Sequence, residues 1–282
     1  MSDEQGHEPP APRKPRFGAS RLLDSYLDSP LSGLAPWILV SVLGGPGRFG
    51  TAIAIVFGLT LFTLWAGYRR GDRMHSLTVF GAAYFGVLLV IRALTGVEAD
   101  QWLSTWTGEM SNIALTVFAV ATLLIRRPFT LSYAKETTPE EFWDAPAFIR
   151  INYAVSAVWA GSFAFAAVVG FVGIVWLHDP DNFWTGWVLQ LAATFFALSF
   201  TGAYPDYAGL KWEREAGLSD EPLPSLLPIV DWLPSYVVTI GIIGLIIDEI
   251  PTWLGITLIA AGALSAAAIR RISPPAARKS PA

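Results

Sequence analysis

The sequence contains no cysteine, and only 15% of its 282 residues are charged. Without cysteine there can be no disulfide, no cysteine-ligated zinc, no iron–sulfur cluster and no thiol nucleophile. Soluble domains carry about 25% charged residues and about 45–50% apolar residues, whereas 53% of this chain is apolar. The shortage of charge and the excess of apolar residues together indicate a polytopic membrane protein.

Long apolar runs bounded by charge or proline predict seven membrane spans, because about 20 apolar residues are needed to cross a bilayer. An eighth run, at residues 34–45, is short for a crossing and could be a re-entrant arm. The predicted fold is therefore an all-α polytopic transmembrane helical bundle with seven or eight crossings. The seven long runs cover residues 49–68, 75–91, 110–125, 152–177, 183–203, 229–247 and 251–269.

Lysine and arginine are concentrated in alternate segments between these spans. Since cytoplasmic loops carry an excess of Lys and Arg, those segments are predicted to face the cytoplasm. The basic N-terminal tail shares that side only if the short run crosses, which gives eight crossings with both termini inside. Seven crossings with the tail outside is the alternative. Of the 19 basic residues, 17 lie in the segments 1–33, 69–74, 126–151, 204–228 and 270–282.

This topology divides the chain into five parts. A cytoplasmic tail (1–33) precedes a transmembrane core (34–203), and a cytoplasmic loop (204–228) leads to a C-terminal transmembrane hairpin (229–269) and a second cytoplasmic tail (270–282).

Two cytoplasmic segments have the pattern of helices that lie along the membrane surface. Residues 20–28 place leucines and a tyrosine on one face and charged residues on the other. A second helix is predicted to begin at Thr138, because Thr138-Pro139-Glu140-Glu141 is a capping box with proline at the first helical position.

The chain offers no constellation of catalytic residues. His7, His75 and His178 lie in a tail, at an inner end and at an outer end of spans, so no two can form a bis-histidine haem site or a histidine metal site. Phosphate loops, nucleophile elbows and zinc-protease motifs are absent. The net charge of −4 and the lack of a basic stripe argue against nucleic acid. We therefore expect no cofactor, no metal and no enzymatic activity.

Four polar residues in or near the spans are candidates for a ligand path, because such residues normally face the interior of a bundle. Arg92 lies at an external span end, where it either reaches the headgroups or pairs with Glu98 or Glu109. Glu109 and Asn112 share a helix face and could bind a cation or a polar headgroup, or satisfy the start of the helix. Gln190 lies at mid-depth, where an interhelical hydrogen bond is expected.

Residues 126–160 form the most distinctive stretch of the sequence. Pro128 ends the preceding helix directly after a pair of arginines. The stretch is either a well-anchored interfacial loop or a surface that binds lipid headgroups or a partner protein. The candidate residues of this surface are Arg127, Pro128, Phe129, Lys135, Glu136, Trp143 and Asn152.

Here the chain resembles the bacterial intracellular septation protein A family in an ordered pattern that covers residues 33–203. A short run from Pro36 precedes a span that ends in a basic cluster, and an external segment with Trp102 and Trp106 comes next. The third span ends in Arg127-Pro128-Phe129. The pattern is completed by Lys135-Glu136, Pro139, Trp143, Arg150-Ile151-Asn152 and Trp159-Ala160.

The resemblance implies a protein of the bacterial cytoplasmic (inner) membrane that acts in envelope maintenance and septation, with division or envelope membrane proteins as partners and no established enzymatic activity. The long N-terminal tail and the hairpin 229–269 depart from the family pattern and indicate a distant relative.

Three functions are thus compared. The first is a non-enzymatic membrane protein of envelope maintenance or septation. The second is a transporter or lipid-handling protein for a small or amphipathic substrate, in which Arg92, Asn112 and Gln190 converge on one cavity near the midplane. The third, an intramembrane enzyme, is disfavoured because no ionisable residues are paired within a span.

Overall fold

A computed structural model describes residues 31–43, 48–70 and 74–272, and every regular element in these ranges is helical. The predicted interfacial helix at 20–28 lies outside the described residues. The elements are α2 (Leu31–Leu43), α3 (Phe49–Arg70), α4 (Ser76–Thr95), η1 (Gly96–Ala99), α5 (Asp100–Leu124), α6 (Thr130–Thr137), η2 (Glu140–Phe142), α7 (Pro146–Phe171), η3 (Val172–Trp176), η4 (Phe183–Val188), α8 (Leu189–Glu215), η5 (Leu227–Ile229), α9 (Leu233–Ile246) and α10 (Thr252–Ile272).

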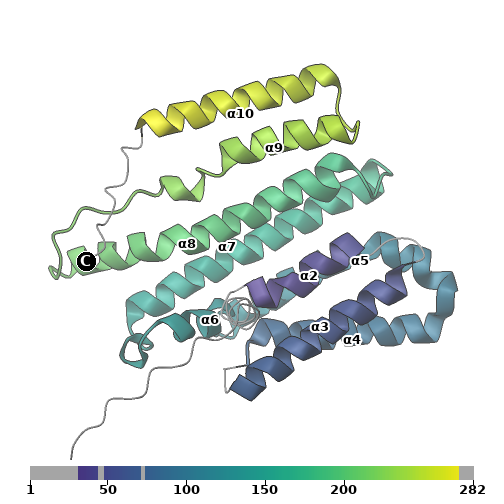
Figure 1. The fold of residues 1–282 in the computed structure, drawn as a ribbon. Helices are drawn as coiled ribbons and strands as arrows, with labels where there is room; N and C mark the ends of the chain where they lie inside the picture. The colour runs from purple at the N-terminus through teal and green to yellow at the C-terminus, as the bar shows by residue number, and fades with distance from the viewer. Residues whose placement is uncertain (1–30, 44–47, 71–73, 273–282) are drawn as a thin grey trace, which may run out of the picture.

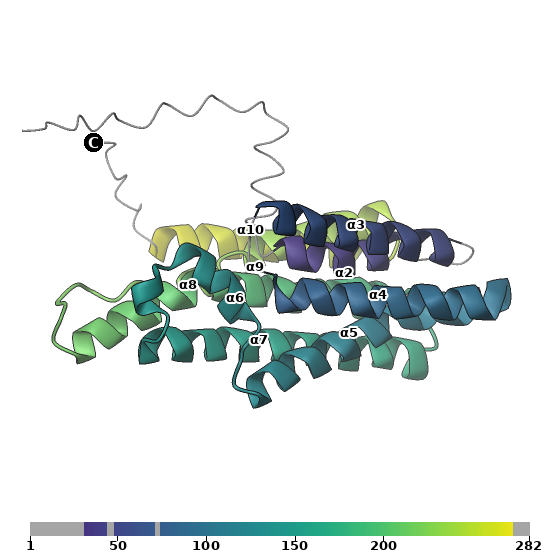
Figure 2. The same ribbon diagram turned by 90° about the horizontal axis from the view of Figure 1, so that it is seen from below.

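Seven helices in the described part of the chain are long and apolar enough to cross a membrane, and all seven coincide with the predicted long runs. The helices lie roughly side by side (Figure 1). In the view turned by 90°, α3 and α10 lie on one face and α5 and α7 on the opposite face (Figure 2). The prediction of an all-α polytopic bundle is confirmed.

Two helices extend beyond their predicted spans. The external segment that holds Trp102 and Trp106 is not a loop, because α5 already begins at Asp100. The predicted loop 204–228 is wrong in its first half, since α8 continues through Pro205 and ends at Glu215. Hydropathy marks where the hydrocarbon ends, but a helix can continue into water with polar residues on its surface.

The helix predicted to begin at the Thr138 capping box is also absent. Only the three-residue 3₁₀ turn η2 comes after Pro139, and no side chain caps it. The helix of this stretch lies earlier, as α6, and Thr138 comes directly after its last residue. The capping-box pattern here coincides with the end of one helix.

The short run at 34–45 forms α2, whose 13 residues span only about 20 Å at 1.5 Å per residue. Gly33 lies against Leu77, at the start of α4, and Gly50 lies against Arg92, near the end of α4. The chain therefore passes from one end of α4 to the other between Gly33 and Gly50. This path agrees with a crossing and disagrees with a re-entrant arm.

Charge divides the bundle into two ends. The links from α4 to α5, from α7 to α8 and from α9 to α10 gather at one end, whereas α6 and the link from α8 to α9 lie at the other (Figure 1). The first end carries Asp179, Asp181, Asp248 and Glu249, and the second carries arginines at the end of α3, the end of α5 and the end of α8. The segregation on which the predicted topology depends is therefore present in the fold.

The main core lies between α2, α3, α4, α5 and α7. Trp37 of α2 is 5% exposed, and its ring centroid lies 5.0 Å from that of Tyr84 and 4.8 Å from that of Phe85. Gly81 of α4 also lies against this indole. An aromatic cluster thus attaches the short helix to α4.

The helices α9 and α10 form a closely packed hairpin. A methyl group at Gly262 would lie 2.6 Å from the carbonyl oxygen of Pro234 and 2.7 Å from a methyl carbon of Val238, and one at Gly241 would lie 2.8 Å from the carbonyl oxygen of Gly255. Small residues let helix backbones approach this closely in membranes. Only 11% of the apolar window of α10 is buried, so most of its apolar surface is not covered by the described part of the chain.

We expect Gly262→Ala to destabilise the protein by about 1–3 kcal/mol, the usual range for overpacking, because the new methyl group meets backbone atoms of α9. Gly202→Ala is the matched control, since no described atom would lie within 4 Å of its methyl group, and alanine favours a helix by roughly 1 kcal/mol over glycine. Thermal unfolding, followed by tryptophan fluorescence, measures Tm for each variant. We expect a lower Tm for Gly262→Ala and no decrease for Gly202→Ala. Equal Tm values for both variants would contradict the close packing.

Candidate functional site

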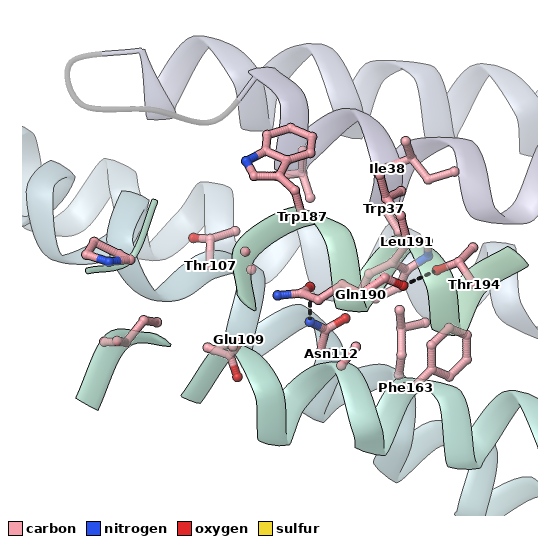
Figure 3. Close-up of a pocket in the computed structure, with 18 of the residues that line it drawn as sticks. Trp37, Ile38, Thr107, Glu109, Asn112, Phe163, Trp187, Gln190, Leu191 and Thr194 are labelled. Carbon is pink, nitrogen blue, oxygen red and sulfur yellow. Dashed lines mark hydrogen bonds between the residues drawn. The ribbon is translucent and has the colours of Figure 1, made fainter. Parts of the chain in front are cut away.

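The polar candidates lead to a cavity of about 270 Å³ between α2, α5, α7 and the start of α8. Each helix contributes residues at helical spacing, so that one stripe of side chains faces the space. Figure 3 shows the side chains of Glu109, Asn112 and Gln190 in this cavity. Its polar lining comprises Ser104, Thr105, Thr107, Glu109, Asn112, Ser162, Asp181, Gln190 and Thr194, and its aromatic lining comprises Trp37, Phe49, Trp159, Phe163 and Trp187.

A hydrogen bond between two amides joins α5 to α8. Asn112 Nδ2 donates to Gln190 Oε1 at 3.0 Å, and Gln190 Nε2 donates to the carbonyl oxygen of Thr185 at 2.8 Å. The interhelical hydrogen bond predicted for Gln190 is therefore present, with Asn112 as its partner. Two candidates from separate helices are brought together (Figure 3).

Glu109 lies one helical turn before Asn112 and is only 3% exposed. Its Oε2 atom is buried and has no hydrogen-bond partner among the described residues. Its Oε1 atom lies against Gly170 of α7, where a methyl group would overlap the carboxylate and come within 3.0 Å of Gln190 Nε2. The carboxylate can occupy this position only because residue 170 has no side chain.

Arg92 does not belong to the cavity. It forms an ion pair with Asp100, and Arg92 Nη2 donates to Asp100 Oδ2 at 3.1 Å. The predicted pairing with Glu109 is wrong, and the side chain of Glu98 lies outside the described residues. The structure therefore brings Glu109, Asn112 and Gln190 together at one cavity, whereas Arg92 lies outside it, because a carboxylate at the start of α5 pairs with the guanidinium locally.

A second, apolar groove of about 680 Å³ lies between the start of α8 and α9. Trp187 and Leu191 line both this groove and the polar cavity. Beyond them, Val188 faces the groove and Gln190 faces the cavity. The first turns of α8 thus separate a polar space inside the bundle from an apolar space beside it.

At the opposite end, the stretch 126–152 is anchored by internal contacts. Thr130 Oγ1 lies 2.8 Å from Ser156 Oγ and donates to the Asn152 carbonyl oxygen at 3.1 Å. Asn152 Nδ2 donates to the carbonyl oxygen of Phe148. Pro128, Phe129 and Asn152 are buried, so their predicted role in a partner-binding surface is wrong.

The other candidates of that surface are wholly or partly accessible. Arg127 is exposed, Lys135 lies over the Trp143 ring at 4.8 Å, and Trp143 Nε1 donates to the Thr138 carbonyl oxygen. Glu136 lies 3.0 Å from His75 Nε2. The predicted anchored loop and a smaller exposed surface are therefore both present.

Sequence reasoning did not identify Gly170, which leaves space for the Glu109 carboxylate, or Asp100, which pairs with Arg92. It also missed two π-helical segments, η3 and η4, which face each other across Gly173 and Thr185 at the outer end of the cavity. Asn182 begins η4, and its side-chain oxygen accepts from the backbone N–H groups of Trp184 and Thr185. An asparagine at a helix start is a recognisable cap and could have located the beginning of this helix.

No protein-family model, no curated protein and no solved structure matches the chain. Within the described ranges, no group of three or more His, Cys, Asp or Glu side chains could hold a metal ion. The function must therefore be inferred from the geometry of the cavity.

If the cavity contains water, a thiol that lines it should react with a charged, water-soluble methanethiosulfonate. Because the chain has no cysteine, each cysteine variant carries a single thiol. Ser162 lines the cavity, so Ser162→Cys places the thiol there. Gly161, the preceding residue, is exposed on the outside of α7, where no described atom would lie within 4 Å of a Cβ, so Gly161→Cys is the control.

We expect Ser162→Cys to react at least about tenfold faster than Gly161→Cys in liposomes, because the reactive thiolate does not form in hydrocarbon. Mass spectrometry of the modified protein gives both rates. Equal rates would show that the cavity is closed to water.

Proposed function

We propose that this integral membrane protein is a non-enzymatic transporter or lipid-handling protein that binds a small polar or amphipathic ligand in the cavity between α2, α5, α7 and α8. The observation that carries the proposal is the convergence of Glu109, Asn112 and Gln190 on one cavity. Polar residues are costly in a bilayer and mark substrate paths when they face the interior of a bundle.

The size and lining of the cavity fit a ligand site. Binding pockets are mostly apolar and contain a few well-placed polar groups, and here aromatic side chains line the same space as two carboxylates and two amides. The two amides are held by their mutual hydrogen bond, so the polar groups are positioned before a ligand arrives. Such preorganisation lowers the entropic cost of binding.

The mouth of the cavity favours a ligand with an apolar part. Ile38, Trp187 and Leu191 line the cavity and are 46%, 44% and 39% exposed. In a bundle surrounded by lipid, these exposed side chains face hydrocarbon. The adjoining groove along α8 and α9 is lined by apolar residues on the same side, which supports entry from the bilayer as well as from the outer end.

A second proposed function is the role in envelope maintenance and septation at the bacterial inner membrane that the family resemblance implies. It is supported by the exposed rim of the anchored stretch, where Arg127, Glu141 and Asp144 face outward. These charges are available to a division or envelope protein. They lie at the opposite end from the acidic links, so the two proposals use separate parts of the molecule.

Ligand binding can be tested by thermal unfolding of the purified protein with choline, glycine, glycerol and glycerol phosphate as a cation, a zwitterion, a neutral polyol and an anion. A ligand that binds only the folded state raises Tm with its concentration. We expect at least one probe to raise Tm, and that probe should then be taken up by liposomes containing the protein.

The double variant Asn112→Leu with Gln190→Leu should lose this shift while keeping a Tm near that of the wild type, because replacing both partners of a hydrogen bond by apolar groups is nearly neutral. Gln101→Leu, at an exposed position of α5, is the matched control and should keep the shift. If no probe raises Tm, the proposed ligand site is wrong.

The proposed orientation, with both termini in the cytoplasm, is supported by the separation of basic and acidic ends. We expect the thiol of Asp220→Cys, in the link between α8 and α9, to react with a membrane-impermeant maleimide only in inverted vesicles. The thiol of Glu249→Cys, in the link between α9 and α10, should react in intact spheroplasts, since these exposed positions lie at opposite ends. The reverse pattern would invert the topology.

A further inference from the structure

We infer that the ligand of the cavity is a small organic cation with an ammonium group, for which Glu109 is the counter-ion. This inference rests on the proposed ligand site and names its chemical class. It joins a carboxylate that no described residue neutralises, a lining without basic residues, and tryptophan walls around the same space.

The first observation is the isolation of the Glu109 carboxylate. Its Oε2 atom has no hydrogen-bond partner within the described part of the chain, although the side chain is only 3% exposed. The nearest amides are directed elsewhere, because Asn112 donates to Gln190 and Gln190 donates to Thr185. A buried carboxylate without a partner is strongly unfavourable, so a positive charge or a proton from outside the described residues is needed to complete the site.

The second observation is the sign of the lining charges. The described residues that line the cavity include two carboxylates, Glu109 and Asp181, and no Lys, Arg or His. Arg92 is held by Asp100. A cleft with one sign of charge and low-dielectric walls concentrates ions of the opposite sign, which here are cations.

The third observation is that the lining hydroxyls face the cavity as acceptors. Thr105, Thr107 and Thr194 each donate their hydroxyl proton to the backbone carbonyl four residues earlier on the same helix. A hydroxyl that donates in this way keeps only lone pairs for a ligand. These lone pairs place partial negative charge around the cavity and therefore favour a cation, whereas an anion would find few donors here.

The fourth observation separates an organic cation from an inorganic one. Trp37, Trp159 and Trp187 line the cavity, and Trp159 Nε1 donates to Thr201 Oγ1 at 3.0 Å, which fixes its ring. Tryptophan faces attract ammonium groups by the cation–π interaction, and such walls are typical of quaternary ammonium sites. A space of about 270 Å³ is also far larger than a bare metal ion requires.

The test compares choline with 3,3-dimethylbutan-1-ol, which has the same shape without the charge. Isothermal titration calorimetry on the full chain in nanodiscs measures both, with sodium chloride as an inorganic control. We expect choline to bind and the neutral alcohol to bind at least about tenfold more weakly, since only choline gains the attraction to the Glu109 carboxylate and the cation–π contacts.

Glu109→Gln should weaken choline binding by at least about tenfold. Glu249→Gln makes the same change at an exposed position and should leave binding unchanged. Comparison of the two probes on the wild type keeps the inference testable if Glu109→Gln fails to fold.

Three outcomes would overturn the inference. Equal affinity for choline and the neutral alcohol would show that the cavity does not distinguish a cation from a neutral ligand, as expected if Glu109 is protonated. Displacement of choline by sodium at equal concentration would assign the site to an inorganic ion. Failure of choline to bind while glycine, glycerol or glycerol phosphate raises Tm would leave the proposed ligand site standing and remove only the cationic class.

Discussion

Hydrocarbon offers no water to a polar group, and this constraint decides where almost every polar side chain of the bundle lies. Thr60 and Thr63 donate to carbonyl oxygens of their own helix, and Asn112 and Gln190 satisfy each other. Each is an inexpensive way to pair a polar group within lipid. Glu109 departs from this pattern because its Oε2 atom has no partner among the described residues, and the proposed ligand site is built on this difference.

The same constraint explains how much of the fold the sequence predicts. The spans can be predicted because each needs a continuous apolar run. The basic and acidic ends can be predicted because charged side chains are excluded from hydrocarbon. The constraint ends at the interface. From Asp100 to Glu109 and from Tyr204 to Glu215, water can satisfy polar side chains on a helix as well as on a loop, so hydropathy does not distinguish the two, and the predicted helix ends are wrong there.

The site is predicted in its members but not in its pairings. Periodicity places Glu109 and Asn112 on one face of α5 and Gln190 within its span, yet the Asn112–Gln190 bond joins residues 78 positions apart, and one sequence holds no record of which helices are neighbours. The sequence also does not predict that Arg92 pairs with Asp100, since several carboxylates lie close to Arg92 along the chain. Gly170 is a small residue in a helix that contains many, and only the packed bundle shows that it accommodates a carboxylate.

The cavity also depends on an irregularity in the helices that frame it. The π-helical segment η4 ends at Val188, two residues before Gln190, and each extra residue in a turn rotates the downstream side chains by about 100° relative to an uninterrupted α-helix. The orientation of Gln190 toward Asn112, and of Trp187 and Leu191 toward the boundary between cavity and groove, is thus fixed by this segment. A π turn is rarer than an α turn and is frequently found at functional sites. Its presence beside the unpartnered Glu109 is consistent with selection for the shape of this cavity rather than for the stability of the helix.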